Sequence, residues 1–373
     1  MSATETFLEG FREEPGYLDY GRVGPLSATV VAETLGQTEL LSRARYGSLD
    51  PLFAQDERAR EAVAAVTGFR AEQVVSQPNT SMGLMHTMFG LTGGVLLSAA
   101  EFPSIPFAAV RAAQALNVVT PVWLETEHGR VTPGQVKEQL TGDVVAVAVS
   151  LVDSRTGAVA DLEGLRQVIG DRLLIVDAIQ GFGVVDAPYE LADVVASGGQ
   201  KWVRAGWGTG FLALSEHAVS RLTPVVSGFT GTDVSLPWDD VPPARKDAGA
   251  FQVSNGDNIA YARFAAALEE LDAVGVASVQ ALIAETVTQV IDLADEFTVP
   301  VVSPRDERER AGIVVLEPLP EQLTLLSAAL HNHGITATTR QGTVRLSVHA
   351  GTSTETLDML RAAFTSFSSA AVY

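Results

Sequence analysis

The chain has 373 residues, 46% of them hydrophobic, which is enough for a sizeable core and two domains. Its 45 acidic residues outnumber its 25 Lys and Arg residues, and no basic cluster occurs, which argues against binding nucleic acid or an anionic membrane surface. The sequence has no cysteine, which excludes disulfides, thiolate zinc sites and a cysteine nucleophile or persulfide carrier in this chain.

The first 14 residues are polar and acidic, which is not the pattern of a signal peptide. No uncharged apolar run reaches the roughly 18 residues that a bilayer span needs. We therefore expect a cytoplasmic protein that does not interact with membranes.

Short apolar runs alternate with amphipathic helical patterns over the first two thirds of the chain. Buried strands are predicted at 144–149, 173–176 and 210–214, and helices at 104–116, 162–169 and 260–273. This alternation predicts an α/β domain with a mostly parallel sheet that is covered on both faces.

The last third of the chain has a different pattern, which predicts a smaller α+β domain. Its expected strands are 312–317 and 343–348, and its expected helices are 321–331 and 354–367. The Pro- and Asp-rich stretch 235–247 predicts a surface excursion, because its prolines cannot sustain a helix. We assign residues 16–258 to the large domain and residues 259–373, together with 1–15, to the small one.

Lysine is scarce, and one of the three lysines is set apart by its surroundings. Lys137 and Lys246 lie in polar stretches, whereas Lys201 follows the apolar run 192–196 and a small turn. Apolar surroundings would lower the pKa of Lys201 and leave its amine a nucleophile toward carbonyls. A partly buried structural lysine would give the same pattern.

Two further segments place polar groups at the ends of apolar elements. Asp177 ends the strand predicted at 173–176, where ligands of open α/β sheets bind, and it could pair with a protonated pyridine nitrogen or cap a helix. Asn79, Thr80 and Ser81 precede an apolar helical stretch and could cradle a phosphate or simply cap that helix.

Together, the 79–81 cradle, Asp177 and Lys201 resemble the class V aminotransferase family of fold-type I pyridoxal-phosphate enzymes. This family includes alanine–glyoxylate aminotransferases, isopenicillin N epimerase-like proteins and cysteine desulfurases. The matching core is residues 173–214, and weaker matches extend from about Tyr17 to Arg361. The resemblance implies the cofactor pyridoxal 5′-phosphate, a large domain with a seven-stranded, mostly parallel sheet, a smaller α+β domain, and a site completed in a homodimer.

The resemblance also implies roles around the cofactor ring. Lys201 would hold the cofactor as a Schiff base and move protons, and Asp177 would pair with the pyridine nitrogen. Gln180 and Ser154 are expected near the 3-hydroxyl of the ring. Phe102, in the segment Glu-Phe-Pro-Ser, is expected to stack on the ring; the alternative is a core residue.

The phosphate is expected to contact a larger set of polar residues. In the same subunit these are Asn79, Thr80, Ser81, Ser197 and Gln200. From the neighbouring subunit the contact would come from Thr232, in the segment Thr-Gly-Thr-Asp, or from Asn255. The resemblance does not decide between these two.

For the substrate, the resemblance assigns the carboxylate to Arg345, because a planar guanidinium suits that group. Gly21 is expected to allow close backbone approach, and Arg22 is a second candidate anion contact. The six histidines form no metal set: His331 and His333 are expected to lie solvated at a helix end.

Two departures from the family bear on the reaction. Without cysteine, the persulfide mechanism of cysteine desulfurases is excluded, and Gln200 stands where those enzymes have histidine. Gln200 resembles the alanine–glyoxylate branch, whereas Lys201-Trp202 and residues 230–233 resemble the epimerase and lyase branches.

We expect an aminotransferase acting on a small amino acid and its oxo acid, with a carbon–sulfur or other β-lyase, or an epimerase, as the alternative. A non-catalytic cofactor-binding protein is a third hypothesis, which the presence of both Lys201 and Asp177 disfavours. The acidic surface would favour cationic or zwitterionic substrates.

Overall fold

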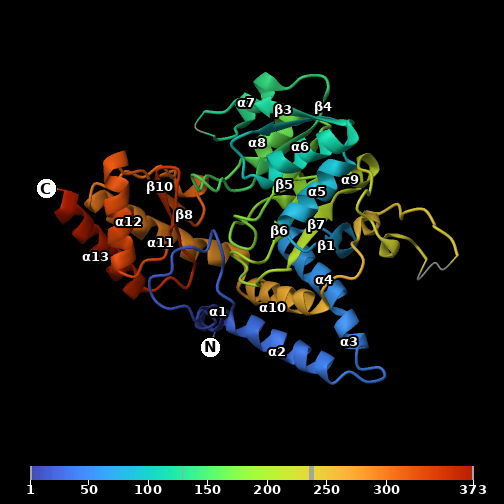
Figure 1. Cartoon of the computed structure of the whole chain (residues 1–373), viewed down its shortest axis with the longest axis horizontal. Helices are drawn as coiled ribbons and strands as arrows, with labels where there is room; N and C mark the ends of the chain where they lie inside the picture. Colours follow the sequence, from blue (N-terminus) through green and yellow to red (C-terminus); the bar gives the residue numbers. More distant parts are fainter. Residues whose placement is uncertain (1, 128, 235–238, 372–373) are drawn as a thin grey trace.

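A seven-stranded sheet forms the centre of the large domain (Figure 1). The structure is a computed structural model that describes residues 2–127, 129–234 and 239–371. The strands are β1 (Val74–Ser76), β2 (Gly93–Ser98), β3 (Val119–Leu124), β4 (Val144–Ser150), β5 (Leu173–Asp177), β6 (Val194–Gly198) and β7 (Gly210–Leu214). Their order is β1-β7-β6-β5-β4-β2-β3, and β7 pairs antiparallel with both of its neighbours while the other pairs are parallel. The predicted seven-stranded, mostly parallel sheet is confirmed.

Successive residues of each strand point into two different cores. In β5, Leu173 and Ile175 face the core that contains α5 and α6, whereas Leu174 and Val176 face the core that contains α4, α8 and α10. Both faces are therefore buried, and this explains why the strands are continuous apolar runs in the sequence.

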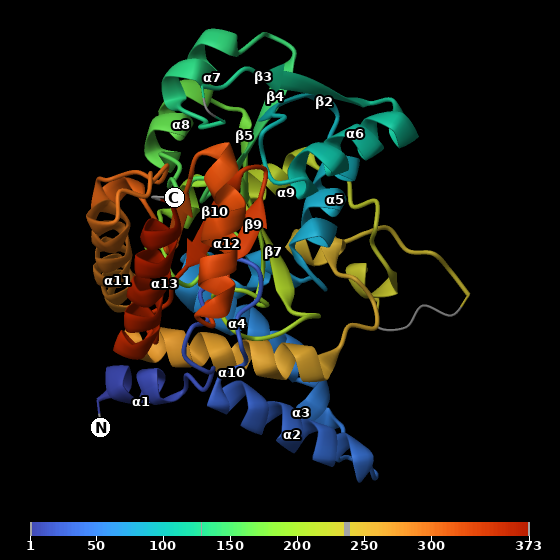
Figure 2. The same cartoon turned by 60° about the vertical axis from the view of Figure 1, so that its left-hand side comes forward.

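Ten helices of the described chain surround this sheet or lead into it. They are α1 (Ala3–Glu9), α2 (Ala28–Ser42), α3 (Asp50–Phe53), α4 (Gln55–Thr67), α5 (Thr80–Gly90), α6 (Ser104–Leu116), α7 (Pro133–Gln139), α8 (Leu162–Ile169), α9 (Glu216–Arg221) and α10 (Asn258–Val274). Helix α10 crosses the domain boundary predicted at 258/259 and packs against α2 and α4, as Figure 2 shows. The division at that residue stays a prediction.

The small domain is built on a three-stranded antiparallel sheet. Its strands, in the order β8-β10-β9, are β8 (Ile313–Leu316), β10 (Thr343–Ser347) and β9 (Thr338–Arg340). Three helices accompany them: α11 (Val276–Glu296), α12 (Leu323–Asn332) and α13 (Thr354–Ala371). The N-terminal segment joins this sheet through bridges from Tyr17 to Thr336 and from Asp19 to Ser347.

Helix α11 is long and apolar enough to cross a membrane by length and composition alone. In the structure its residues Val279, Ile283, Val287 and Val290 are buried in the hydrophobic core. We therefore interpret α11 as a core helix of this domain.

Part of the predicted surface excursion at 235–247 lies outside the described residues, namely 235–238. The described remainder is irregular apart from an isolated bridge between Ala244 and Thr232.

Candidate active site

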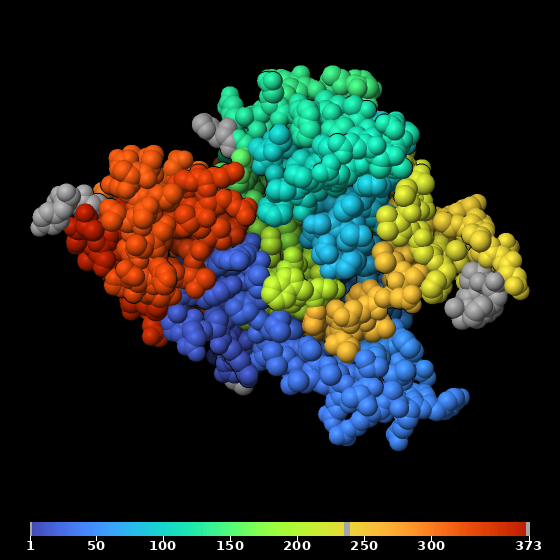
Figure 3. Space-filling model, viewed as in Figure 1, coloured from blue at the N-terminus to red at the C-terminus, as the bar shows by residue number. Residues whose placement is uncertain are grey.

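A cavity of about 1410 Å³ lies between the two domains. One wall comes from loops of the large domain and the N-terminal segment, and the other from the region of β8, β9 and β10. Figure 3 shows the small domain standing apart from the upper part of the large domain. The cavity brings together seven of the predicted residues: Gly21, Arg22, Phe102, Ser154, Gln180, Lys201 and Arg345.

Lys201 reaches the cavity from the loop that follows β6, and it is only 8% exposed. Burial lowers the pKa of its ammonium to about 8, although the Asp177 carboxylate opposes this effect and Arg345 adds to it. The Lys201 Nζ atom lies 5.3 Å from the centroid of the Phe102 ring. Roughly a tenth of the amine is therefore free at neutral pH, far more than for a lysine of ordinary pKa, as a nucleophile toward a carbonyl requires.

Asp177 lies at the carboxyl end of β5 and is almost completely buried. Its Oδ1 atom accepts a hydrogen bond of 3.1 Å from the amide of Ile179, whereas its Oδ2 atom has no partner among the described residues. Burial raises the pKa of Asp177 to about 6, although the Ile179 amide and Lys201 both lower it. A buried carboxylate oxygen without a donor is costly, so this atom indicates a place for a ligand's N–H group.

Gln180 holds the Lys201 loop against the N-terminal segment. Its Oε1 atom accepts a hydrogen bond of 2.9 Å from the Trp202 indole, and its Nε2 atom donates one of 2.9 Å to the Gly21 carbonyl. These contacts fix the orientation of the amide and leave one N–H of Nε2 free for a ligand in the cavity.

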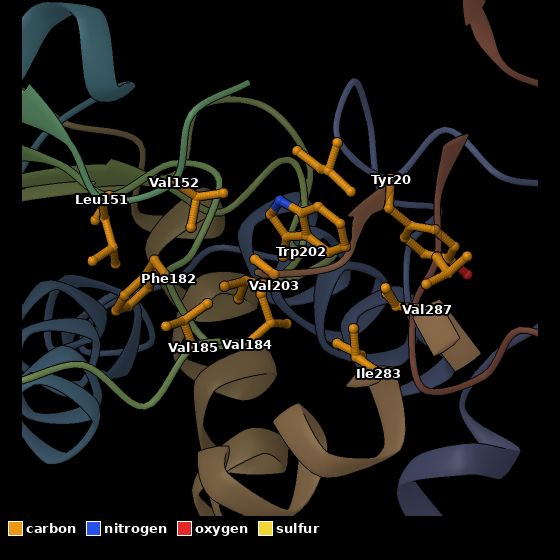
Figure 4. Packing of buried hydrophobic residues seen from close by; sticks show 14 of the residues in the cluster. Tyr20, Leu151, Val152, Phe182, Val184, Val185, Trp202, Val203, Ile283 and Val287 are labelled. Carbon is orange, nitrogen blue, oxygen red and sulfur yellow. The ribbon is translucent and has the colours of Figure 1, made fainter. Parts of the chain in front are cut away.

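Trp202, next to Lys201, is at the centre of the hydrophobic cluster shown in Figure 4, with Tyr20 beside it. The Trp202 carbonyl lies 2.8 Å from Nε2 of His349, whose Nδ1 atom accepts a hydrogen bond from the Ala350 amide. Burial lowers the pKa of His349 to about 3, so the ring is neutral and Nε2 carries the hydrogen. The Lys201 loop is thus anchored to the strand that carries Arg345.

Gly24 holds the same loop by direct backbone contact. Its amide donates a hydrogen bond of 2.9 Å to the Gln200 carbonyl. A Cβ atom at position 24 would collide with the Lys201 carbonyl oxygen. Only glycine allows this approach. The sequence did not predict this role of Gly24, because the residues in contact are far apart along the chain.

Arg345 projects from β10 and is largely buried. Its guanidinium lies 3.6 Å from the Asp19 carboxylate, and it donates to the Ser154 carbonyl and to the Thr338 hydroxyl, both at 3.4 Å. A Cβ atom on Gly21 would collide with Ser347 Oγ and lie 3.3 Å from Cζ of Arg345, so the Gly21 backbone closely approaches β10, and its role toward a substrate stays a prediction.

The predicted phosphate residues gather at the start of α5. Asn79 caps this helix, since its Oδ1 atom accepts a hydrogen bond of 3.0 Å from the Met82 amide. Thr80 Oγ1 and Gln200 Oε1 are buried without hydrogen-bond partners among the described residues. A Cβ atom on Gly198 would collide with Gln200 Oε1 and lie 3.3 Å from Thr80 Oγ1, so both side chains adjoin the same point. A helix N-terminus and a free hydroxyl suit an anionic group.

The two remaining phosphate candidates of the same subunit make other contacts. The Ser81 hydroxyl lies 2.8 Å from that of Ser104, which links the cradle to α6. The Ser197 hydroxyl donates weakly to the carbonyl of Gly198, at 3.4 Å. Their roles toward phosphate stay predictions.

Thr232 and Asn255 do not line the cavity. The Thr232 hydroxyl donates to the Phe229 carbonyl at 2.9 Å, and Asn255 is exposed with a positive φ of 59°. A contact of 2.9 Å between the hydroxyls of Thr230 and Ser254 joins the two segments. Both candidates therefore belong to neighbouring segments, and a reach into a second subunit stays a prediction for each.

Glu101 is a buried carboxyl group whose role the sequence did not suggest. It accepts a hydrogen bond of 2.5 Å from the hydroxyl of Ser150, which lies opposite Asp177 in the register of β4 and β5. Burial raises the pKa of Glu101 to about 7, and Asp153 and Asp177 raise it further while Ser150 lowers it. The only signal in the sequence was its position just before Phe102.

Among the described residues, no group of three or more His, Asp or Glu side chains could hold a metal ion. His333 Nε2 instead lies 2.8 Å from the Ser366 hydroxyl.

The model of the family described as "Aminotransferase class-V" matches residues 51–371. The chain belongs to this family. The match covers both domains, including the elements that carry Lys201, Asp177 and Arg345.

Curated relatives of this class-V chain share modest identity with it. A cysteine desulfurase of Frankia sp. (strain EuIK1) is 28% identical over 190 residues, which are 46% of this chain and 45% of that protein. A probable cysteine desulfurase of Aeropyrum pernix is 27% identical over 294 residues, which are 72% of this chain and 70% of that protein. The chain thus matches less than half of the length of the Frankia relative.

Solved structures share the class-V fold over nearly the whole chain. A cysteine desulfurase from Thermococcus onnurineus NA1 superimposes with a TM-score of 0.82 at 22% identity, covering 93% of each chain. A cystine C–S lyase, solved with cysteine persulfide, superimposes with a TM-score of 0.83 at 17% identity, covering 94% of this chain and 97% of that one. These likenesses confirm the fold-type I architecture.

Pyridoxal phosphate is the cofactor of this class-V enzyme. A variant of the same C–S lyase is solved with glycine linked to this cofactor. The residues of the present chain fit the group: Lys201 offers an amine of lowered pKa, and Asp177 offers a buried oxygen without a donor. Thr80, at the N-terminus of α5, offers a free hydroxyl for the phosphate.

Proposed function

We propose that this class-V enzyme is a β-lyase that breaks a carbon–sulfur bond in a small amino acid. The observation that carries the proposal is that the buried Lys201 amine and Arg345 line one cavity, while the Asp177 carboxylate lies close enough to Lys201 for each charge to shift the pKa of the other. The names of the relatives support carbon–sulfur chemistry, since they are cysteine desulfurases and a cystine C–S lyase.

Each residue of the site has its own role in the proposed reaction. Arg345 binds the α-carboxylate of the substrate, and Lys201 Nζ accepts the proton from Cα. Asp177 would pair with the pyridine nitrogen of the cofactor, which when bound would supply the electron sink for the reaction. The Cβ–S bond then breaks, and its electron pair leaves with sulfur.

The leaving sulfur must go to solution or remain on a small molecule. A persulfide on the protein would need a cysteine, and the 373-residue sequence contains none. Free thiol or persulfide, a 2-oxo acid and ammonia are therefore the expected products.

Transamination is the second candidate, and Gln200 favours it. This glutamine precedes Lys201 where the desulfurase branch has histidine, and its buried Oε1 atom lies beside Gly198 rather than in the cavity. The proton that Lys201 removes from Cα would then return to the cofactor, with no bond to sulfur broken.

Product analysis of the holoenzyme separates the two reactions. Cystine, S-alkylcysteines and alanine would be incubated with the enzyme, and thiol, ammonia and 2-oxo acid measured together with the visible absorption of the cofactor. Equal release of sulfur product and ammonia with stable absorption supports the lyase. Loss of absorption that an oxo acid reverses, without sulfur release, contradicts the lyase and supports transamination.

A further inference from the structure

The cavity has the opposite charge from the rest of the chain. The formal net charge is −20, yet six arginines and Lys201 line the cavity against three glutamates. The arginines are Arg22, Arg130, Arg155, Arg305, Arg340 and Arg345. The global acidity that would favour cationic or zwitterionic substrates therefore does not extend to the place where a substrate binds.

Three of these arginines are paired with carboxylates of the protein. Arg130 lies 3.1 Å from Glu309, and Arg155 lies 4.0 Å from Asp153. Arg305 binds Asp295 through two contacts of 2.5 and 2.9 Å. Their charges are balanced by carboxylates of the protein, so these arginines contribute little attraction for a substrate.

Two other guanidiniums share a single carboxylate, and a third has none among the described residues. Asp19 is buried and lies 3.6 Å from Arg345 and 4.0 Å from Arg22. Arg340 ends β9, beside the strand of Arg345, and no described carboxylate lies within ion-pair distance of it. Burial lowers the pKa of Arg345 and Asp19 raises it, while the charges of Arg340 and Arg22 lower it, so both of these guanidiniums are close enough to repel that of Arg345.

The cluster of Arg22, Arg340 and Arg345 carries more positive charge than Asp19 and one carboxylate of a substrate can balance. Asp19 balances one positive charge, and the α-carboxylate of an amino acid at Arg345 balances a second. One positive charge is left, on exposed side chains at the edge of the cavity where Arg22 and Arg340 lie.

We propose that the cavity binds an amino acid whose side chain carries a second oxyanion, held by Arg340 and Arg22 while Arg345 holds the α-carboxylate. The inference rests on the proposed function and specifies its substrate class: cysteine derivatives whose sulfur substituent carries a carboxylate. An oxyanion between two guanidiniums accepts charge-assisted hydrogen bonds that an amide of the same shape cannot match.

Binding of non-reacting anions tests the subsite without catalysis. Calorimetry on the holoenzyme would compare succinate with its monoamide. We expect succinate to bind roughly 10-fold tighter or more, and this ratio to fall toward one in Arg340→Gln and with added salt. Arg308→Gln is the matched control, since Arg308 is exposed, pairs with Asp306 and does not line the cavity. Equal binding of the two compounds, or a ratio that Arg340→Gln leaves unchanged, overturns the proposal.

Turnover of a matched substrate pair tests the same subsite in the reaction. S-carboxymethylcysteine should have a KM roughly 10-fold lower than that of its side-chain amide, with a similar kcat, and Arg340→Gln should abolish this difference. Equal KM values contradict the second oxyanion subsite while leaving the lyase function intact. Absence of any sulfur release from either compound refutes the lyase function, and the calorimetric ratio still decides the subsite.

Discussion

The two walls of the cavity are built in different ways. On the large-domain side, Lys201 lies in the loop after β6 and Asp177 ends β5 behind the wall; both are buried, and hydrogen bonds hold the Asp177 carboxylate and the Lys201 loop. The small-domain wall presents arginines on β9 and β10, and the outermost of them, Arg340, is exposed without an ion pair among the described residues. We therefore propose that the large-domain wall carries the chemistry common to the family, whereas the arginines of the small-domain wall select the substrate.

The most severe test of this comparison is removal of the amine. Lys201→Ala should reduce turnover by roughly 10³-fold or more, because both the attachment of the cofactor and the proton acceptor are lost. Turnover and the visible band of the lysine-linked cofactor would be measured, with Lys137→Ala, an exposed lysine on α7, as the control. If Lys201→Ala keeps the band and the rate, the large-domain wall does not carry the chemistry.

Removal of the charge of Asp177 should have the next largest effect. Asp177→Asn keeps the shape of the side chain but no longer stabilises a protonated pyridine nitrogen, so we expect a loss in kcat of roughly 10²-fold or more. Asp186→Asn, at an exposed aspartate, is the control. A normal kcat in Asp177→Asn would mean that its unpartnered oxygen serves another ligand.

The contact between Gly24 and the Lys201 loop gives a further test of the large-domain wall. Gly24→Ala introduces a methyl group that collides with the Lys201 carbonyl, and the displaced loop should cost roughly 10-fold to 100-fold in kcat. Gly36→Ala is a matched control, because a methyl group there meets nothing within 4 Å inside α2. Equal rates in the two variants would show that the Lys201 loop tolerates displacement.

The smallest effect concerns stability rather than rate. Burial raises the pKa of Glu101 from an ordinary value of 4.5 to about 7, so the folded state holds this proton more tightly than the unfolded chain. Its contribution to stability is therefore present at low pH and lost as the pH rises through 7.

In the cofactor-free protein, the free energy of unfolding should depend less on pH in Glu101→Gln than in the parent. The difference amounts to about 3 kcal/mol at most. The free energy of unfolding would be measured at about pH 5 and about pH 8. Glu163→Gln, an exposed glutamate in α8, should leave the pH dependence unchanged. An identical pH dependence in Glu101→Gln and the parent would show that Glu101 is ionised throughout.

Local patterns were sufficient to predict much of the fold. The helices predicted at 104–116 and 162–169 match α6 and α8 in full, because their apolar spacing and ends are local signals. The order of the strands, by contrast, depends on pairing between distant segments. Strand β1 has only three residues, too few for a periodic pattern.

The residues of the candidate site differ in the same way: some have a local signal in the sequence and others do not. Lys201 and Asp177 were predictable because each ends an apolar run, whereas Asp19 and Arg340 have no local signature. Those two matter only because bridges from Asp19 to Ser347 and the β9–β10 pairing bring residues more than 300 positions apart to one place. Their role follows from tertiary structure alone.

The path of residues 17–24 also bears on how the protein is made. This segment pairs with Thr336 and Ser347, and its amide at Gly24 then holds the Lys201 loop, which His349 anchors from the other side. Both anchors depend on residues 336–349, which are synthesised after the strands of the central sheet. A nascent polypeptide can form the central sheet, but the Lys201 loop has both of its anchors only after residue 349 has left the ribosome.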